Sequence, residues 1–354
     1  MISGKFAADL RVTALTLAIG ALGAAIGTWA HIPVPLLLGP ACAVSIAALA
    51  QVRVGLADWL RNCCFVVLGL SIGAGLDSDA GAAIVRWPLA FVALFISLMI
   101  TLFLCKWVLV RVFGFDARSA VLASAPGHLS FVMSLAADSG ADIGRVAVVQ
   151  AIRILALTLI VPFLALALGL RVDALGAIGS APPMGVIQLV VMVVVGVAAG
   201  LVFRRLRLPA PLLLGPMAVS GVGHLTNVAP GTMPVELVTP AFLVLGTLIG
   251  ARFAGMTLRS LRESALAGLA ATVISAAVAL AAALPVAVAL GFPVAHVLTA
   301  FAPGGLETMI ALGTALGASP GFVAACHVLR LLMLTVLIPL SHARSDRTGA
   351  APQA

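Results

Sequence analysis

The chain has 354 residues, of which 62% are hydrophobic and only 9% are charged, and its mean hydropathy is +1.23. Soluble proteins are about 45–50% apolar and about 25% charged, so this composition excludes a soluble enzyme, a disordered chain and a secreted disulfide scaffold. The net charge of +8 comes from Lys and Arg clustered beside apolar runs, as in the cytoplasmic loops of membrane proteins. Because no soluble module presents a basic face, no nucleic-acid partner is predicted.

Apolar runs recur along the whole chain, and each run of about 20 residues can cross the roughly 30 Å hydrocarbon layer. The first run continues to Trp29 without a small-residue cleavage site, so it is predicted to be a retained helix and not a signal peptide. The sequence thus predicts an all-α polytopic protein embedded in the lipid bilayer. In the first half, the apolar segments are expected at 12–30, 36–52, 60–76, 85–110, 119–138 and 146–170.

Three ordered matches indicate an internal duplication. Their offset stays at 176–177, which shared apolar composition alone rarely produces. The third match has sixteen identities in forty residues. The chain therefore divides into a first membrane repeat, 1–176, and a second, 177–354, which ends in a short cytoplasmic tail at 342–354. The matching segments are PLLLGP at 35–40 and 211–216, LGLSIGAG at 68–75 with LGTLIGAR at 245–252, and 123–162 with 300–339.

One segment in each half, 119–138 and 299–316, carries an Ala-Pro-Gly sequence that should interrupt its helix. Pro removes a backbone donor and Gly relaxes the chain. If both segments re-enter without crossing, about five crossings remain in each half. Every strong Lys/Arg cluster then falls on one side, which the positive-inside rule makes the cytoplasm. If both segments crossed, Arg204 and Arg205 would fall outside. The sequence thus predicts two inverted repeats of about five transmembrane helices each, with both termini in the cytoplasm.

Inverted repeats with interrupted helices at matching positions are typical of secondary transporters, whose sites lie near the bilayer midplane. An Arg in each half, Arg153 and Arg330, lies inside an apolar run, which costs several kcal/mol unless the charge is paired or faces water. Two interpretations stay open. The arginines could bind an anion, with Glu307 binding a proton or cation, or they could only cap backbone carbonyls or pair with Glu307 or Asp142. The candidate substrate- and ion-binding residues are Ser124, Pro126, Gly127, His128, Ser130, Gln150, Arg153, Pro303, Gly304, Gly305, Glu307, His327 and Arg330.

Further glycines and prolines mark candidate helix breaks or points of close packing. Small residues let helix backbones approach each other in membranes, so both interpretations are kept. No metal site is predicted, because the six His and five Cys are scattered among separate segments. The helix-break or packing candidates are Gly39, Pro40, Gly69, Gly73, Gly215, Pro216, Gly246 and Gly250.

These motifs resemble the AbrB family of bacterial integral membrane proteins. The resemblance covers nearly the whole chain and rests on the duplicated PLLLGP, the LGxxIGA stretch, APGG-L-E-x-M at Ala302–Met309, and A-x-x-x-L-R ending at Arg330. It implies an inner-membrane protein with an internal duplication, and one branch of the family carries a role in regulating gene expression. The first half departs from the motif at His128–Ser130, which argues against a symmetric two-carboxylate mechanism.

The family is also labelled an ammonia monooxygenase. Scattered His residues argue against a copper enzyme, which needs clustered ligands, and the lack of a soluble recognition element argues against direct DNA binding. No enzymatic activity and no cofactor are therefore predicted. The sequence predicts a secondary-transporter-like permease for a small, preferably anionic, solute coupled to H⁺ or Na⁺. The alternative is a membrane-embedded sensor or regulatory protein without net transport. A second copy of the chain is a further candidate partner.

Overall fold

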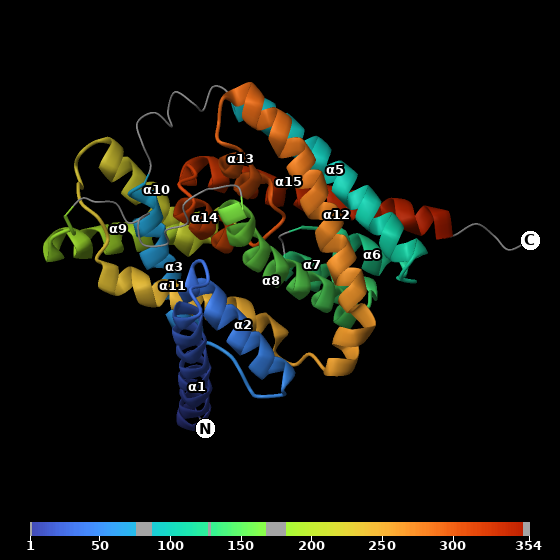
Figure 1. Ribbon diagram of the computed structural model, residues 1–354, viewed down its shortest axis with the longest axis horizontal. Coiled ribbons are helices and arrows are strands. Elements are labelled where there is room, and N and C mark those ends of the chain that lie inside the picture. The colour runs from blue at the N-terminus through green and yellow to red at the C-terminus, as the bar shows by residue number, and fades with distance from the viewer. Residues whose placement is uncertain (1, 76–86, 127–128, 168–181, 350–354) are drawn as a thin grey trace, which may run out of the picture.

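The computed structural model describes residues 2–75, 87–126, 129–167 and 182–349. This part of the chain is helical, apart from its connecting loops and one isolated bridge between Pro183 and Thr232 (Figure 1). Seven of the described helices are long and apolar enough to cross a membrane. These findings confirm an all-α polytopic membrane protein, while the ten crossings and the inverted orientation of the halves stay predictions.

Helices recur in the same order in the two halves. Five of them, α2, α3, α6, α7 and α8, begin 176 or 177 residues before their counterparts. The last helix runs to Gly349 and so includes residues 342–349 of the predicted cytoplasmic tail, whose location stays a prediction. The first-half helices are α1 (Ile2–Trp29), α2 (Pro35–Leu49), α3 (Asp58–Gly73), α5 (Trp87–Arg111), α6 (Ala117–Ser124), α7 (Leu129–Ser139) and α8 (Ile143–Ala167). The second-half elements are α9 (Val186–Arg205), α10 (Pro211–Leu225), α11 (Val235–Gly250), the 3-10 turn η3 (Ala251–Phe253), α12 (Leu258–Leu290), α13 (Val294–Phe301), α14 (Leu306–Ala315) and α15 (Pro320–Gly349).

The backbone conformation of the loops recurs as well. Residues other than glycine rarely adopt a positive φ, yet each of those described here has a partner of the same kind 176 residues away. Val34 and Ala210, with φ of 46° and 42°, directly precede the two PLLLGP sequences and start α2 and α10 in the same way. The three pairs are His31 with Arg207, Val34 with Ala210, and Gln51 with Asn227.

The two halves interlock near the centre of the molecule (Figure 1), where α2 packs against α11 and α3 packs against α10. A Cβ atom on Gly69 would lie 2.4 Å from the carbonyl oxygen of Leu213, and one on Gly246 would lie 2.3 Å from the carbonyl oxygen of Leu37. Gly246 is the counterpart of Gly69, and Leu213 is the counterpart of Leu37. The contacts are therefore reciprocal, as in a pair related by two-fold symmetry.

The other predicted glycines also lie where backbones meet, which confirms the packing interpretation. The helix-break interpretation of the two PLLLGP motifs is wrong, because α2 continues through Pro40 and α10 through Pro216. A proline removes one hydrogen bond, but its fixed φ suits a helix, and a membrane helix tolerates the loss when neighbouring helices cover the site. The nearest backbone atoms to an added Cβ are Met217 O for Gly73 (2.4 Å), Ala41 O for Gly250 (2.8 Å), Gly23 O for Gly39 (2.2 Å) and Gly200 N for Gly215 (2.3 Å).

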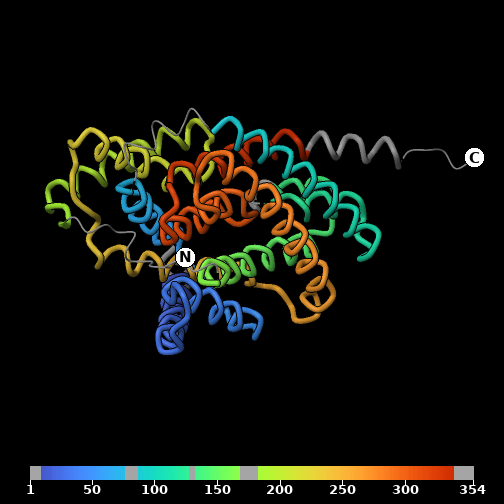
Figure 2. The backbone as a smooth tube through the Cα atoms, turned by 45° about the horizontal axis from the view of Figure 1, so that its top comes forward, coloured from blue at the N-terminus to red at the C-terminus, as the bar shows by residue number. Residues whose placement is uncertain are grey.

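Counterparts also contact each other directly. The thiol of Cys64 on α3 donates to the carbonyl oxygen of its own counterpart, Ala241 on α11, at 3.2 Å. A residue that contacts its own counterpart lies on the axis that relates the two halves. The counterparts α5 and α12 also lie side by side at one edge of the molecule (Figure 2). The short helices α13 and α14 are almost wholly buried, so the second interrupted segment lies inside the core.

Candidate functional site at the two interrupted helices

Both predicted interruptions are present. Helix α6 ends at Ser124 before α7 begins at Leu129, and α13 ends at Phe301 before α14 begins at Leu306. The hydroxyl of Ser124 donates to Ala120 O of its own helix at 2.6 Å, so its proton is already used. Gly127, His128 and the side chain of Ser130 lie outside the described residues.

Arg153 on α8 caps the end of α6. The residue is 1% exposed, and its Nη1 and Nη2 atoms donate to the carbonyl oxygens of Ala123 and Ala125 at 3.2 and 2.8 Å. Its Nη2 also donates to Oε1 of Gln150, whose amide nitrogen donates to Leu122 O and Ala125 O, both at 2.9 Å. The carbonyl end of a helix carries partial negative charge, which stabilises the guanidinium there.

Arg330 on α15 caps the end of α13 in the same way. It is also 1% exposed, and it donates to Ala302 O at 2.7 Å and to Gly304 O at 3.1 Å. His327, one turn earlier, is fully buried, and its Nδ1 lies 2.9 Å from Val323 O. A carbonyl only accepts, so Nδ1 holds the proton. This leaves Nε2 as an acceptor without a partner in the described part of the chain.

The structure therefore confirms that the arginines cap backbone carbonyls, whereas the suggested pairing with carboxylates is wrong. Among the described residues, no ion pair joins Arg153 or Arg330 to an acidic side chain. Asp142 instead approaches Arg145, with Nε and Oδ2 3.9 Å apart. Glu307 is half-buried in the first turn of α14, and its charge acts on Arg252.

The two interruptions meet at one small cavity. Pro126 and Pro303, the prolines of the two Ala-Pro-Gly sequences, both line it, together with Arg330 and with Ser97 and Thr101 of α5. Its volume of about 10 Å³ is roughly the room that one water molecule needs. Arg153 and Arg330 are close enough for their positive charges to act on each other.

Some donors at this site remain free. The Nε atoms of Arg153 and Arg330 are buried and lack a partner in the part of the chain that the structure describes. The residue before α14, Gly305, supplies no side-chain cap to the first backbone N–H groups of that helix. Two buried positive charges without a carboxylate, next to unpaired donors, form an environment that favours an anion.

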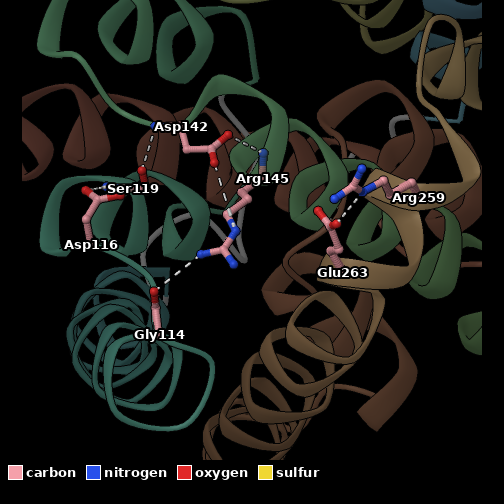
Figure 3. A network of polar contacts seen from close by, with 7 residues as sticks. All are labelled: Gly114, Asp116, Ser119, Asp142, Arg145, Arg259 and Glu263. Carbon is pink, nitrogen blue, oxygen red and sulfur yellow. Dashed lines mark hydrogen bonds and ion pairs between the residues drawn. The ribbon is translucent and has the colours of Figure 1, made fainter.

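A polar network at the start of α6 was missed by the sequence analysis (Figure 3). Asp116 accepts from Ser119 N at 2.8 Å and so caps α6, while Ser119 Oγ accepts from Asp142 N at 2.8 Å. Arg145 donates to Gly114 O at 3.3 Å. Partial burial raises the pKa of Asp116, but hydrogen bonds from the side chain and backbone of Ser119 outweigh this and hold the pKa below its usual value. An Asp directly before an apolar run is the signal that could have revealed this cap.

Aromatic packing replaces this network in the second half. The guanidinium of Arg145 lies 4.8 Å from the ring centre of Phe115. Their counterparts are Phe322 and Phe292, whose ring centres lie 5.5 Å apart. Trp87 also packs against Phe322, with ring centres 5.6 Å apart. The starts of α6 and α13 are therefore equivalent in the two halves, but polar and charged side chains surround the first and aromatic side chains surround the second.

Comparison with known proteins gives a family and two relatives. The sequence model of the family described as "Transition state regulatory protein AbrB" matches residues 36–344. The chain is 28% identical over 338 residues to "Putative regulator AbrB" of Escherichia coli (strain K12), which covers 93% of both chains. It is 27% identical over 290 residues to "Uncharacterized protein YhjN" of Bacillus subtilis (strain 168), which covers 77% of this chain and 75% of that protein.

Proposed function

The chain belongs to the AbrB family of membrane proteins, and we propose that it is a secondary-transporter-like permease for a small anionic solute, coupled to H⁺ or Na⁺. One observation carries this proposal. Arg153 and Arg330 are fully buried at two helix interruptions, and no described carboxylate neutralises either of them. The helix-end carbonyls supply only partial negative charge, and burying a charge without full compensation costs several kcal/mol, so such a pair is expected where a ligand supplies the opposite charge.

The arrangement of the interruptions supports a transport cycle. In secondary transporters, interrupted helices at matching positions of two repeats supply backbone donors at the midplane. Here the cavity between the interruptions holds about one water, so the described conformation is a closed one. A substrate enters only when the ends of α6 and α13 move apart, and each arginine can then exchange a carbonyl contact for the anion.

Glu307 is the proposed site of coupling. It is the carboxylate of the second interruption, and the first half has Ser130 at the same position. A carboxylate in the first turn of a short helix can bind a proton or a cation and so change the charge of the site by one unit. We further propose an inner-membrane location, ten crossings in two inverted repeats and cytoplasmic termini, with no enzymatic step and no nucleic-acid contact.

The second candidate function is a membrane-embedded sensor. The observation that favours it is the name of the Escherichia coli relative, a regulator. In that case the same two arginines would bind an anion, and the bound state would signal without moving the anion across the membrane. The site chemistry is the same for both functions, so only a flux measurement separates them.

The test uses the full-length protein in lipid nanodiscs and liposomes. Thermal unfolding is measured with small carboxylates, phosphate and ammonium, at several pH values, with and without Na⁺. A ligand at a hundredfold excess over its Kd stabilises by about 2.7 kcal/mol. We expect a carboxylate or phosphate to stabilise the parent and not Arg330→Lys, and we expect Glu307→Gln to abolish the dependence on pH or Na⁺.

Liposome flux of the stabilising anion then decides between the two functions. Binding with flux supports the permease, and binding without flux under any ion gradient supports the sensor. If no anion stabilises the parent while Arg330→Lys unfolds like the parent, the proposed anion site is wrong.

A further inference from the structure

A groove of about 510 Å³ lies between α5 and α12 and is open to the outside of the protein. This volume lies within the range of about 300–1,000 Å³ that is usual for small-molecule sites. On α5 the groove extends from Leu89 to Ile100, which is about 16 Å at a rise of 1.5 Å per residue. That length is close to half of the roughly 30 Å hydrocarbon layer. Of the described residues that line the groove, Ser97 alone is polar.

Small residues of α12 make the groove hollow. The second half has alanine at three lining positions where the first half has larger side chains, two of them on α5 and the third directly after its end. The groove thus depends on sequence that differs between the halves, and it is not a general result of two helices crossing. The three pairs are Ala281 with Leu104, Ala282 with Cys105, and Ala289 with Val112.

The groove adjoins the cavity at the two helix interruptions. Ser97 lines both, and Arg330 lines the cavity. The Nε atom of Arg330 is buried and lacks a partner among the described residues, so a positive donor without an acceptor lies beyond Ser97. An apolar groove that leads past one hydroxyl to a buried guanidinium is complementary to a molecule with a hydrocarbon chain and an anionic head.

We infer that the substrate is an amphiphilic anion, a carboxylate on a hydrocarbon chain, whose chain lies in the α5–α12 groove while its head reaches Arg330. This inference rests on the proposed function and adds the substrate class. The cavity is too small for a carboxylate in the described conformation, so α5 and α12 separate near Ser97 when the head enters. The substrate then reaches the site sideways, from the hydrocarbon layer.

The test compares the parent with a variant in which the groove is filled. The double substitution Ala281→Leu with Ala289→Val introduces the side chains that the first half carries at the equivalent positions, and both residues are exposed on α12, so the helix should tolerate them. The matched control is Ala277→Ile, at an exposed position of α12 outside the groove, where the equivalent residue of α5 is Ile100. Thermal unfolding in nanodiscs is titrated with butyrate and dodecanoate, and with dodecanol and dodecyltrimethylammonium as probes of charge.

Partition into the bilayer also increases with chain length, so the decisive quantity is the difference between variants at one ligand. We expect the filled variant to lose about tenfold in apparent affinity for dodecanoate, or about 1.4 kcal/mol. It should keep the parent's response to butyrate, and the Ala277→Ile control should match the parent throughout. Dodecanol and dodecyltrimethylammonium should leave the melting temperature of all three proteins unchanged.

Two results would overturn the inference. If the filled variant and the parent respond equally to dodecanoate, the groove holds ordinary membrane lipid. If dodecanol stabilises as well as dodecanoate, the charge is not recognised. In either case, a response to butyrate that Arg330→Lys abolishes still supports the proposed function. If phosphate stabilises the parent but no carboxylate does, only this inference is contradicted. If neither phosphate nor any carboxylate stabilises the parent, both proposals are contradicted together.

Discussion

The two helix interruptions share a geometry but differ in how fully their polar groups are satisfied. Arg153 makes three hydrogen bonds, one of them to Gln150, and the amide nitrogen of Gln150 itself reaches two carbonyls. Arg330 makes two, and the neighbouring His327 keeps a buried Nε2 without a partner among the described residues. The first interruption is therefore the better satisfied of the two and acts as the structural anchor, with Arg153 Nε as its one unpaired donor among the described residues. The second keeps two unpaired atoms, Arg330 Nε and His327 Nε2, which a ligand could use.

The surroundings of the two interruptions reinforce this difference. Charged and polar side chains fix the start of α6 (Figure 3). At the start of α13 the aromatic pair Phe292 and Phe322 packs instead. The second half also carries Glu307 in the first turn of α14. The two halves thus share a backbone arrangement but carry different polar side chains. This difference allows the first interruption to stabilise the fold while the second binds and releases a ligand.

Replacing each arginine in turn should have the largest effect on stability, and it tests which interruption is the structural anchor. Arg153→Gln removes three hydrogen bonds from a charged donor, each worth about 1.5–3 kcal/mol, so it should lower the free energy of unfolding by several kcal/mol. Arg330→Gln should cost less stability but remove the response to anions. Thermal and denaturant unfolding in nanodiscs measure both. A larger loss of stability in the Arg330 variant would mean that the second interruption is the anchor.

Substitution of the equivalent glycines Gly69 and Gly246 should reduce stability equally, whereas the two interruptions should respond differently to substitution. Gly69→Ala and Gly246→Ala each place a Cβ within 2.4 Å of a carbonyl oxygen on the opposite half, and such overpacking costs about 1–3 kcal/mol or more. We expect equal losses for the two variants in thermal unfolding. Gly144→Ala is the control, because its Cβ would meet only a side-chain oxygen of Asp142 at 3.4 Å. Unequal losses would show that the interlocked helices are less symmetric than their contacts suggest.

A third comparison concerns the side chains beside the arginines. Gln150→Leu leaves Leu122 O without its donor and should cost about 1–3 kcal/mol. His327→Leu removes a ring whose Nε2 has no described partner, so its effect on stability should be smaller. The melting temperatures of the two variants test this directly. If His327→Leu is the more damaging substitution, an unseen partner must satisfy Nε2.

The smallest expected effect is at the cap of α6. Asp116→Ala should lower stability by about 1 kcal/mol. Because its hydrogen bonds lower the pKa of Asp116, its extra stabilisation is present above the unfolded-state pKa of about 3.9 and is lost as the pH falls through the lower folded-state pKa. Asp116→Asn keeps an acceptor but cannot titrate, so its stability should fall less between pH 6 and pH 3. Parallel pH profiles for the parent and Asp116→Asn would contradict this.

Much of this arrangement could be predicted from the sequence, since its signals are local. Pro and Gly at 126–127 and 303–305 indicated interrupted helices, and an Arg within an apolar run indicated a buried charge with a partner. The same reasoning went wrong at Pro40 and Pro216, because whether a proline ends a helix depends on what covers the freed carbonyl.

The partners of the arginines and the α5–α12 groove could not be predicted from the sequence, because they depend on how distant helices pack. Backbone carbonyls are present at every residue, so no pattern distinguishes Ala302 or Gly304 as the acceptor for Arg330. Ala281 and Ala289 look like ordinary residues of an apolar helix until the structure shows that they line a groove. Contacts between counterparts, such as that of Cys64 with Ala241, follow from the arrangement of whole helices and not from local pattern.

Helices of the first half pack against helices of the second half, α2 against α11 and α3 against α10. This packing also determines when the first half can finish folding during synthesis. Gly69 on α3 does not meet its neighbours Leu213 and Pro216 until α10, about 150 residues later in the chain, has been made. At about 5–20 residues per second, this delay is roughly 10–30 s. During that time the glycine face of α3 in the newly made first half is exposed to lipid or to an insertion factor. Its maturation is therefore a post-insertion event, completed only when the second half arrives in the bilayer.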